Sequence, residues 1–336
     1  MKARLIYNPS SGQEIIKKNV ADILDKLESF GYEASAFQTT PEPQSAQKEA
    51  TRATEAGFDL IVAAGGDGTI NEVVSGMSPF DKRPKLAIIP TGTTNDFARA
   101  LKIPRNKPLA AVEMIGKNQT LNIDVGQVND AEYFINIAAG GSLTELTYSV
   151  PSRLKTAFGY LAYLAKGVDL LPQIRKRKVK VTHDDGVFEG EISMFFAALT
   201  NSVGGFEKIA PDAKLDDGLF TLILVKTDNL FELLALISMV IKGSHVDDVN
   251  IEYLKSSQIK VEPLTDKKMM INVDGEYGGD APVTFRNLHG HIEIFVNLDE
   301  INNDHYLGDE EEEDLEAVAQ KFAEEAEQLK EEVKYS

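Results

Sequence analysis

Cysteine is absent from all 336 residues of this chain. Its absence excludes disulfide bonds, thiolate catalysis and zinc sites with thiolate ligands, and it fits a reducing cytosol. Long apolar runs are also scarce, since the longest, residues 233–241, is too short to cross a bilayer. The first residues have no long apolar core followed by a small-residue cleavage site, so we expect no secretory leader.

Histidine is scarce, and a familiar nucleotide motif is missing. The five histidines lack metal-ligand spacing, so we expect surface or hydrogen-bonding roles for them. No Gly-x-x-x-x-Gly-Lys-Ser/Thr run occurs, which excludes a P-loop enzyme. The net charge is −18, and residues 309–336 carry half of it, with twelve acids against three lysines. Because the rest of the chain is only mildly acidic, we expect no nucleic-acid partner.

Two glycine-rich stretches, residues 65–72 and 90–97, each follow a short apolar run and precede a segment with helical spacing. In an open α/β sheet, ligands bind at the carboxyl ends of such strands. Glycine lets backbone amides approach a phosphate, and a helix N-terminus favours its charge. The carboxylates of Asp67 and Asp96 can hold a divalent cation there. The sequence therefore predicts an enzyme that binds a polyphosphate.

Strand and helix patterns alternate up to about residue 120 and then change character. The first part predicts an α/β domain with a doubly wound parallel sheet. Short alternating segments follow and predict an all-β, antiparallel β-sandwich, with helices over 152–170 and 229–242. We expect a nucleotide-binding domain over 1–124, a β-sandwich domain over 125–297, and an acidic segment with an amphipathic helix over 298–336.

Four signatures in order resemble the catalytic domain of the diacylglycerol kinase family. They are Asn-Pro-Ser-Ser-Gly at 8–12, Gly-Gly-Asp-Gly-Thr-Ile-Asn-Glu at 65–72, Pro-Thr-Gly-Thr-Thr-Asn-Asp-Phe at 90–97, and Asp-Gly-Glu at 274–276. The resemblance extends from Ile6 to about Asn297, and residues 199–202, 205–208 and 211–218 are most similar to the soluble bacterial members. It implies a kinase that transfers the γ-phosphate of ATP to diacylglycerol, with magnesium.

The resemblance also implies which residues contact the nucleotide. They are Asn8, Pro9, Ser10, Ser11, Gly12, Thr39, Gly66, Asp67, Gly68, Thr69, Ile70, Asn71, Glu72 and Thr93. Hydroxyl groups in this set can donate to phosphate oxygens, and the glycines expose amides. An isolated glycine would indicate only a turn, but the joint pattern favours a phosphate site.

A second acidic turn resembles the family's magnesium site. The resemblance implies that the ion is held by the side chain of Asp217 and the carbonyls of Lys214 and Leu219. Asp67, Asp96 and Asp217 would then form a water-bridged network. A solvated acidic turn is the simpler alternative.

Asp274 and Glu276 follow an apolar run, and the period of a strand can place both carboxylates on one side. General-base catalysis needs a carboxylate near the attacking hydroxyl. The resemblance places the base in this motif, and the sequence argument favours Asp274, with Glu276 close behind. A lone Asp-Gly would indicate a hairpin turn instead.

A lipid acceptor implies contact with a membrane. Residues 153–180 hold eight cations against one acid and are rich in aromatic and leucine side chains, a pattern that suits an anionic bilayer surface. Lys166 is our preferred contact, although a half-buried helix and a charged strand edge explain the same residues. We expect a cytoplasmic protein, peripherally associated with the inner face of the membrane, and leave open whether it is a homodimer.

Three alternatives remain at this level. A kinase of the same fold can act on another lipid alcohol, such as phosphatidylglycerol, a sphingoid base or an undecaprenol-like alcohol. An NAD kinase shares the Gly-Gly-Asp-Gly-Thr run, but the signatures at 8–12 and 95–97 argue against it. A lipid or nucleotide sensor without activity is disfavoured because every motif carboxylate is present.

Overall fold

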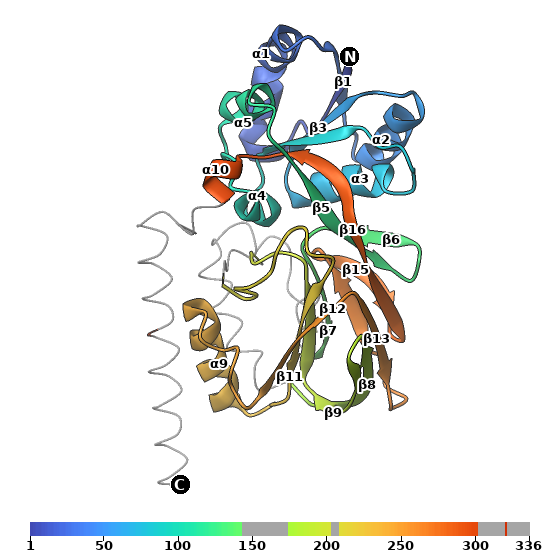
Figure 1. Ribbon diagram of the computed structural model, residues 1–336, viewed down its shortest axis with the longest axis vertical. Coiled ribbons are helices and arrows are strands. Elements are labelled where there is room, and N and C mark those ends of the chain that lie inside the picture. Colours follow the sequence, from blue (N-terminus) through green and yellow to red (C-terminus); the bar gives the residue numbers. More distant parts are fainter. Residues whose placement is uncertain (143–173, 203–207, 302–319, 321–336) are drawn as a thin grey trace. The chain divides into compact units, whose positions relative to one another are not determined.

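The computed structural model describes residues 1–142, 174–202, 208–301 and 320. The chain divides into two compact units (Figure 1). Unit 1 contains Met1–Asn136, Leu215–Gly218 and Asn287–Asp304. Unit 2 contains Ile137–Lys214, Leu219–Arg286 and His305–Ser336. The chain therefore returns twice to unit 1 after leaving it.

Unit 1 is built on a parallel sheet whose strands are ordered β2, β1, β3, β4 and β16. The first four strands are β1 (Lys2–Tyr7), β2 (Glu33–Gln38), β3 (Leu60–Gly65) and β4 (Lys85–Pro90). The last comes from β16 (Val283–Phe295), where Ile294 pairs with Leu86. A hairpin of β5 (Thr120–Val128) and β6 (Glu132–Phe134) joins β16 through β5.

Helices cover both faces of this sheet, because the connections between parallel strands must cross over it. α1 (Ile15–Ser29), which follows the 3-10 turn η1 (Ser11–Glu14), packs against α5 (Pro108–Gly116). α2 (Ser45–Glu55) packs against α3 (Asp67–Met77) (Figure 1). Two short helices, α4 (Asp96–Ala100) and α10 (Leu298–Ile301), complete the unit.

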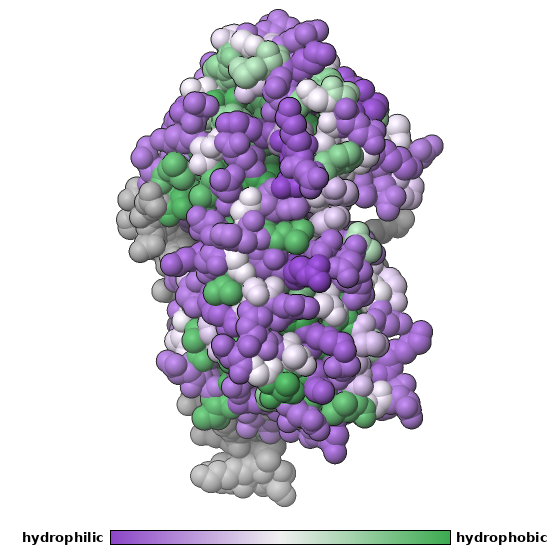
Figure 2. Space-filling model, turned by 45° about the vertical axis from the view of Figure 1, so that its right-hand side comes forward, coloured by the Kyte–Doolittle hydropathy of each residue, from purple (hydrophilic) through white to green (hydrophobic). Residues whose placement is uncertain are grey.

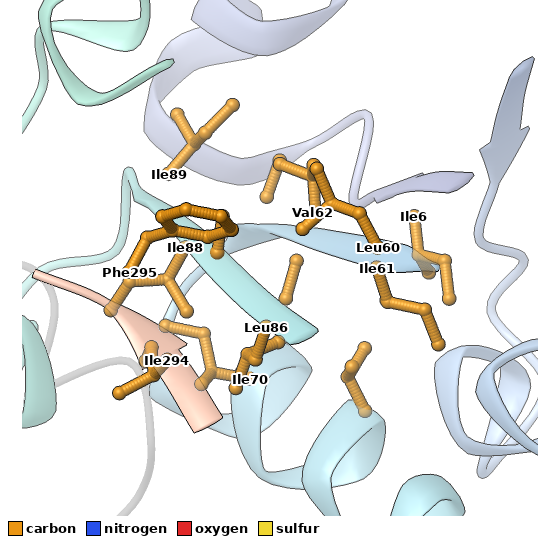
Figure 3. Close-up of a cluster of buried hydrophobic side chains, with 14 of the residues drawn as sticks. Ile6, Leu60, Ile61, Val62, Ile70, Leu86, Ile88, Ile89, Ile294 and Phe295 are labelled. Carbon is orange, nitrogen blue, oxygen red and sulfur yellow. The ribbon is translucent and has the colours of Figure 1, made fainter. Parts of the chain in front are cut away.

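The core of unit 1 explains the continuous apolar runs in its sequence. All six residues of β3 are buried, because a parallel strand covered on both faces has no polar side. Ile294 and Phe295 of β16 lie with Leu86 and Ile88 of β4 in the same cluster (Figure 3). Distant parts of the chain therefore share one core here.

Unit 2 is a sandwich of two sheets. One sheet contains the first part of β16, then β13 (Gln258–Pro263), β8 (Arg177–His183) and β9 (Gly186–Ile192). The other is antiparallel throughout, in the order β12, β11, β10, β7, β14, β15. Its strands are β7 (Ile137–Gly141), β10 (Met194–Ala198), β11 (Phe220–Val225), β12 (Ile251–Ser256), β14 (Met270–Val273) and β15 (Glu276–Asp280).

The alternation along β10 separates the two faces of the second sheet. Phe195 lies between the sheets, where its ring centroid is 6.0 Å from that of Phe285 in β16. Phe196 points to the other face and packs in the cluster that contains Leu233 of α9 (Leu230–Lys242). α9 begins at Asn229, whose side-chain oxygen accepts the N–H groups of Phe231 and Glu232. The sandwich therefore has a helix on its outer face.

The observed architecture confirms the predicted fold class, a parallel α/β part and an antiparallel sandwich. The helix expected over 229–242 is α9, whereas the helix expected over 152–170 lies outside the described residues. Of the acidic segment expected over 298–336, only 298–301, which form α10, and Gln320 are described. In the described part of the chain, no helix has the length and apolarity needed to cross a membrane. On the face drawn in Figure 2, hydrophobic side chains of the described residues are scattered among hydrophilic ones.

Candidate functional site

The loops after β1, β2, β3 and β4 meet at one edge of unit 1, because parallel strands end together. We call this set, residues 8–12, 39, 66–72 and 91–96, the carboxyl edge. Backbone hydrogen bonds hold its loops in register, from Thr39 N to Tyr7 O, from Asn8 N to Ala64 O and from Thr91 N to Gly65 O, each 2.9 Å long. The structure therefore brings together the residues that the sequence predicts to contact a nucleotide, and their contact with one stays a prediction.

The turn at residues 8–12 is fixed by its own side chains. Asn8 Oδ1 accepts the Ser10 N–H at 3.0 Å and the Ser10 hydroxyl at 2.8 Å, as an Asx turn does. Ser11 Oγ donates to the Thr91 carbonyl at 3.0 Å. Gly12 has φ +57°, and a Cβ there would lie 2.8 Å from the Thr91 oxygen. The turn therefore requires glycine, and it is tied to the loop after β4.

The loop after β3 leads directly into α3. Gly66 caps the helix in an extended conformation, so the first N–H groups of α3 face the carboxyl edge. A helix N-terminus of this kind attracts phosphate. Gly68 has no heavy atom within 4 Å of the position a Cβ would take, whereas Ile70 is fully buried. The Ile70 N–H donates to the Gly66 carbonyl at 3.2 Å, so Ile70 holds the first turn of α3 and offers no side chain to a ligand.

The polar side chains of this motif also hold neighbouring elements. Glu72 Oε2 accepts the Ala46 N–H at 2.9 Å in the first turn of α2. Asn71 Nδ2 donates to the Tyr133 carbonyl in β6 at 3.2 Å. The carboxylate of Asp67 accepts the Thr94 hydroxyl at 3.1 Å and a backbone N–H of α4 at 3.4 Å. These residues therefore position α3 among its neighbours, a role that the motif alone did not predict.

The loop after β4 is held by Asn95, which is 1% exposed and has φ 52°. Its side-chain oxygen accepts the Gly92 N–H at 2.7 Å, and its side-chain nitrogen donates to the Gly92 carbonyl at 2.8 Å. Asparagine tolerates this left-handed conformation better than most residues. Thr93 lies exposed at the tip, and Asp96 is the first residue of α4. Asn95 therefore shapes the loop that presents Thr93.

The acidic turn at residues 214–219 is anchored by a buried carboxylate, Asp124 in β5. The Asp124 side chain is 1% exposed. Oδ2 accepts the Gly218 N–H at 2.7 Å and the Asn287 amide at 3.2 Å. Oδ1 accepts the Gly290 N–H at 2.8 Å and lies 3.1 Å from His289 Nδ1. The sequence argument missed Asp124, although an acid between the apolar Ile123 and Val125 was a signal.

Among the described residues, no group of three His, Asp or Glu side chains gathers closely enough to hold a metal ion. Asp67, Asp96 and Asp217 therefore do not form a direct carboxylate cluster, and the water-bridged network between them stays a prediction. The turn at 214–219 offers a carboxylate and carbonyl oxygens, which suit a hard cation such as magnesium. The Gly218 N–H, a donor that would not suit a cation, is directed at the Asp124 carboxylate. The donor set is thus compatible with the ion.

Asp274 and Gly275 form the two-residue turn between β14 and β15, with φ 47° and 94°. The Asp274 carboxylate accepts the Ile137 N–H at 2.9 Å, and the Asp274 N–H donates to the Ile137 carbonyl at 2.9 Å. Glu276 is exposed and pairs with Val273 across the hairpin. Asp274 thus lies in the turn and not in the strand, so the period of a strand does not relate the two carboxylates.

Two family models match the chain. The model described as the diacylglycerol kinase catalytic domain matches residues 2–128, and the model described as the YegS C-terminal NAD kinase beta sandwich-like domain matches residues 146–296. A diacylglycerol kinase of Bacillus subtilis (strain 168) is 52% identical over 88% of this chain and 96% of its own length. The chain belongs to the diacylglycerol kinase family.

Other relatives agree with this assignment. A diacylglycerol kinase of Staphylococcus epidermidis is 48% identical over 90% of this chain and 94% of its own length. A solved diacylglycerol kinase structure from Bacillus anthracis has a TM-score of 0.68 at 25% identity, covering 89% of this chain and 97% of that one. The family resemblance predicted from the signatures is therefore confirmed, and the NAD kinase alternative is not favoured. A kinase of this family uses ATP as a substrate.

The membrane contact expected at Lys166 lies outside the described residues. Residues 174–180 of the basic stretch 153–180 are described. In this part, the lysines of β8 lie opposite acidic residues of the neighbouring strands. Lys178 pairs with Glu191, and Lys180 pairs with Glu189 in β9 and with Glu262 in β13. Lys178 and Lys180 therefore belong to a sheet face on which charges of opposite sign alternate. This agrees with the charged strand edge that was the alternative to a membrane contact for these residues.

Proposed function

We propose that this kinase transfers the γ-phosphoryl group of ATP to the free hydroxyl of diacylglycerol and so makes phosphatidic acid. The observation that carries the proposal is the identity of 52% over 88% of the chain to a protein named diacylglycerol kinase. The intact carboxyl edge is consistent with it. Phosphoryl transfer depends mainly on positioning and on neutralising charge, which bare amides and hydroxyls can provide.

The carboxyl edge is proposed to bind the triphosphate. The first N–H groups of α3 and the bare backbone at Gly66 and Gly68 would donate to phosphate oxygens. Thr93, exposed at the tip of its loop, would add a hydroxyl. Ser11 is already hydrogen-bonded to Thr91, so its main part would be to keep the first turn closed against the loop after β4.

Magnesium is proposed to bind at the turn that Asp124 anchors. The carboxylate of Asp217 and the carbonyls of Lys214 and Leu219 would hold it, since hard cations prefer oxygen ligands. When bound, the ion supplies positive charge that offsets the phosphate charge. Asp124 would keep the turn in shape through the Gly218 N–H. Asp67 and Asp96 would support the ion through water.

Glu276 is proposed as the general base. The sequence argument favoured Asp274, but the Asp274 carboxylate accepts a backbone N–H from β7 and stabilises the hairpin turn. That hydrogen bond engages one carboxylate oxygen of Asp274 with the backbone of β7. Glu276 is exposed at the start of β15, where it can reach a hydroxyl group. Asp274 would then position the turn from which Glu276 extends.

Two isosteric substitutions separate these roles. Glu276→Gln should lower turnover by at least about 100-fold, the usual worth of a general base. Asp274→Asn keeps an oxygen for the Ile137 N–H and tolerates a positive φ, so most activity should remain. ATP affinity and thermal stability should match the wild type in both proteins. The assignment fails if Asp274→Asn is inactive while Glu276→Gln is active.

The acceptor is tested with a panel of lipids. Labelled ATP is supplied with diacylglycerol, phosphatidylglycerol or a sphingoid base in mixed micelles, and the labelled product is separated. We expect labelled phosphatidic acid from diacylglycerol as the main product. A faster reaction with either other lipid would replace diacylglycerol as the substrate and leave the kinase mechanism intact.

The place of action is proposed from the chemistry of the acceptor. Diacylglycerol lies in a bilayer, and ATP and the absence of cysteine both fit the cytosol. We therefore place the protein on the inner face of the membrane, associated peripherally. A homodimer is proposed as the working state, and sedimentation at several protein concentrations tests it.

A further inference from the structure

Two exposed segments of unit 2 lie side by side at one end of β8. Residues 175–178 enter and begin this strand, and residues 264–268 leave β13, its neighbour. The Leu264 N–H donates to the Lys178 carbonyl at 2.9 Å, and the Arg177 guanidinium donates to the Lys268 carbonyl. We call these two segments together the basic edge.

Cations dominate the basic edge. Residues 175–178 are four consecutive basic residues, and residues 264–268 add two lysines against one aspartate. Lys178 lies opposite Glu191 of β9, and with this glutamate included the net charge is +4 (six cations and two acids). Acids lie close to some of these cations: Lys176 is 3.9 Å from Asp228, and Lys268 is 3.2 Å from Asp280. The Lys268 side chain is 84% exposed. Such exposed pairs contribute little and can give way to another anion.

The rest of the same sheet face differs from the basic edge. Along β8 and its neighbours, charges alternate across the strands, as in the pairs of Lys180 with Glu189 and Glu262. The Lys260 ammonium lies 2.8 Å from Glu262, whose pKa is lowered mainly by that hydrogen bond. Residues 264–268 lie beyond Pro263, the last paired residue of β13. The excess of cations is therefore confined to one end of the face.

An apolar side chain accompanies the cations. Leu264 is 47% exposed, and all five residues from 264 to 268 are exposed. Lysine stems are themselves apolar, so a lysine can place its ammonium among phosphates while its stem lies along hydrocarbon. A protruding loop with a leucine and two lysines has the chemistry of a surface that enters a headgroup layer.

We propose that the basic edge rests on the anionic surface of the bilayer that contains the acceptor. This inference depends on the proposed function, because only a membrane-borne acceptor gives the enzyme a reason to meet a bilayer. Each cation near an anionic surface contributes about 1 kcal/mol. The loop at 264–268 would enter the headgroup layer through Leu264, while the lysines contact lipid phosphates.

The experiment compares full-length proteins for co-sedimentation with phosphatidylcholine vesicles, with and without phosphatidylglycerol. In the test variant, Lys267→Gln and Lys268→Gln are combined. In its control, Lys82→Gln and Lys117→Gln remove the same charge from exposed positions of unit 1. Leu264→Ser is matched with Val249→Ser, since Val249 is 83% exposed and lies outside the basic edge.

We expect the test variant to bind phosphatidylglycerol vesicles about thirtyfold more weakly than the wild type, from the loss of two cations near the surface. The control pair should bind like the wild type, and added salt should remove the difference. Leu264→Ser should weaken binding to both kinds of vesicle, and Val249→Ser should not. Wild-type binding by the test variant, or an equal loss in the control pair, overturns the proposal.

Turnover with a short-chain, soluble diacylglycerol separates this proposal from the proposed function. The lysine variants should phosphorylate it at the wild-type rate, because no bilayer is involved, and should lose activity only on vesicles. If no protein phosphorylates any diacylglycerol, the proposed function fails. The basic edge then has no role in a lipid kinase, whatever the vesicle assay shows.

Discussion

Gly66 and Gly92 meet through bare backbone at the carboxyl edge. A Cβ on Gly92 would lie 2.6 Å from the Cα of Gly66, and a Cβ on Gly66 would lie 3.2 Å from the Cα of Gly92. Two backbones that approach this closely leave no room for a side chain on Gly92 and only a tight fit for one on Gly66. The loops after β3 and β4 therefore keep their spacing only while both residues are glycine.

Gly92→Ala should separate these two loops. The added Cβ would meet backbone on one side and the buried Asn95 amide, 3.0 Å away, on the other. We expect a loss of about 1–3 kcal/mol in stability, as overpacking usually causes. We also expect ATP affinity to fall at least tenfold, measured by titration calorimetry. Gly68→Ala is the control for stability, since nothing lies within 4 Å of its Cβ position, and its melting temperature should not fall.

Asp124→Asn should loosen the acidic turn. An asparagine amide would present donors to the Gly218 and Asn287 N–H groups that now donate to Asp124. Leaving such buried groups unsatisfied costs about 3 kcal/mol, measured by urea unfolding. The magnesium concentration for half-maximal activity should rise as well. Asp216→Asn changes an exposed acid of the same turn and should alter neither quantity.

Local patterns predicted most of the secondary structure, because spacing within a helix or a buried strand is a property of neighbouring residues. The apolar stripe of α1 and the uninterrupted run of β3 are examples. The partner of β4 was not predictable in this way. It is the end of β16, and Ile294 pairs with Leu86 from more than 200 residues away. No local period encodes such a pairing, so the sequence argument ended the parallel sheet too early.

The sequence predicted some features of the candidate site and not others. The glycine signatures predicted which loops gather, because they follow strands that end at one edge of a sheet. They did not predict that Glu72 accepts an N–H from α2, or that Asp67 accepts groups from the loop and helix after β4. A carboxylate in a motif can contact a ligand, or it can accept N–H groups at the end of a neighbouring helix. Only the fold shows which hydrogen bonds these carboxylates already make.

Glu49 in α2 should make unit 1 sensitive to acid. Burial alone would raise its pKa, but hydrogen bonds and charges from Arg52 and Arg4 outweigh burial and lower the pKa below its usual 4.5. A lowered pKa contributes stability above pH 4.5, and that stability is lost as the pH falls through the folded-state value. Glu49→Gln should therefore cost about 2 kcal/mol at pH 7 in urea unfolding.

The difference between Glu49→Gln and the wild type should shrink as the pH falls below 4.5, because the unfolded wild-type chain then takes up a proton that the folded carboxylate resists. Glu55→Gln provides the control, since Glu55 is exposed on the same helix. A difference that stays constant from pH 7 to pH 4 would contradict the role of the ionised carboxylate. It would indicate that Glu49 acts through packing alone.

His245 should make unit 2 sensitive to acid for the opposite reason. It is fully buried after α9, where Nε2 lies 2.9 Å from the Ile209 carbonyl and the ring meets Tyr253 edge-on. Burial lowers its pKa below the usual 6.5, and backbone hydrogen bonds offset this only in part. The unfolded chain therefore binds a proton near pH 6.5 while the folded chain resists it, so stability falls as the pH drops below 6.5.

His245→Gln removes this proton linkage while keeping a polar group that can donate toward Ile209. The variant should be less stable at pH 8, because a smaller side chain leaves part of the site unfilled. Its free energy of unfolding should nevertheless fall less steeply than that of the wild type between pH 7 and pH 5. The slope is the informative quantity, because a packing defect shifts the whole curve without changing its dependence on pH. Parallel curves for the two proteins would show that His245 does not titrate differently in the folded and unfolded states.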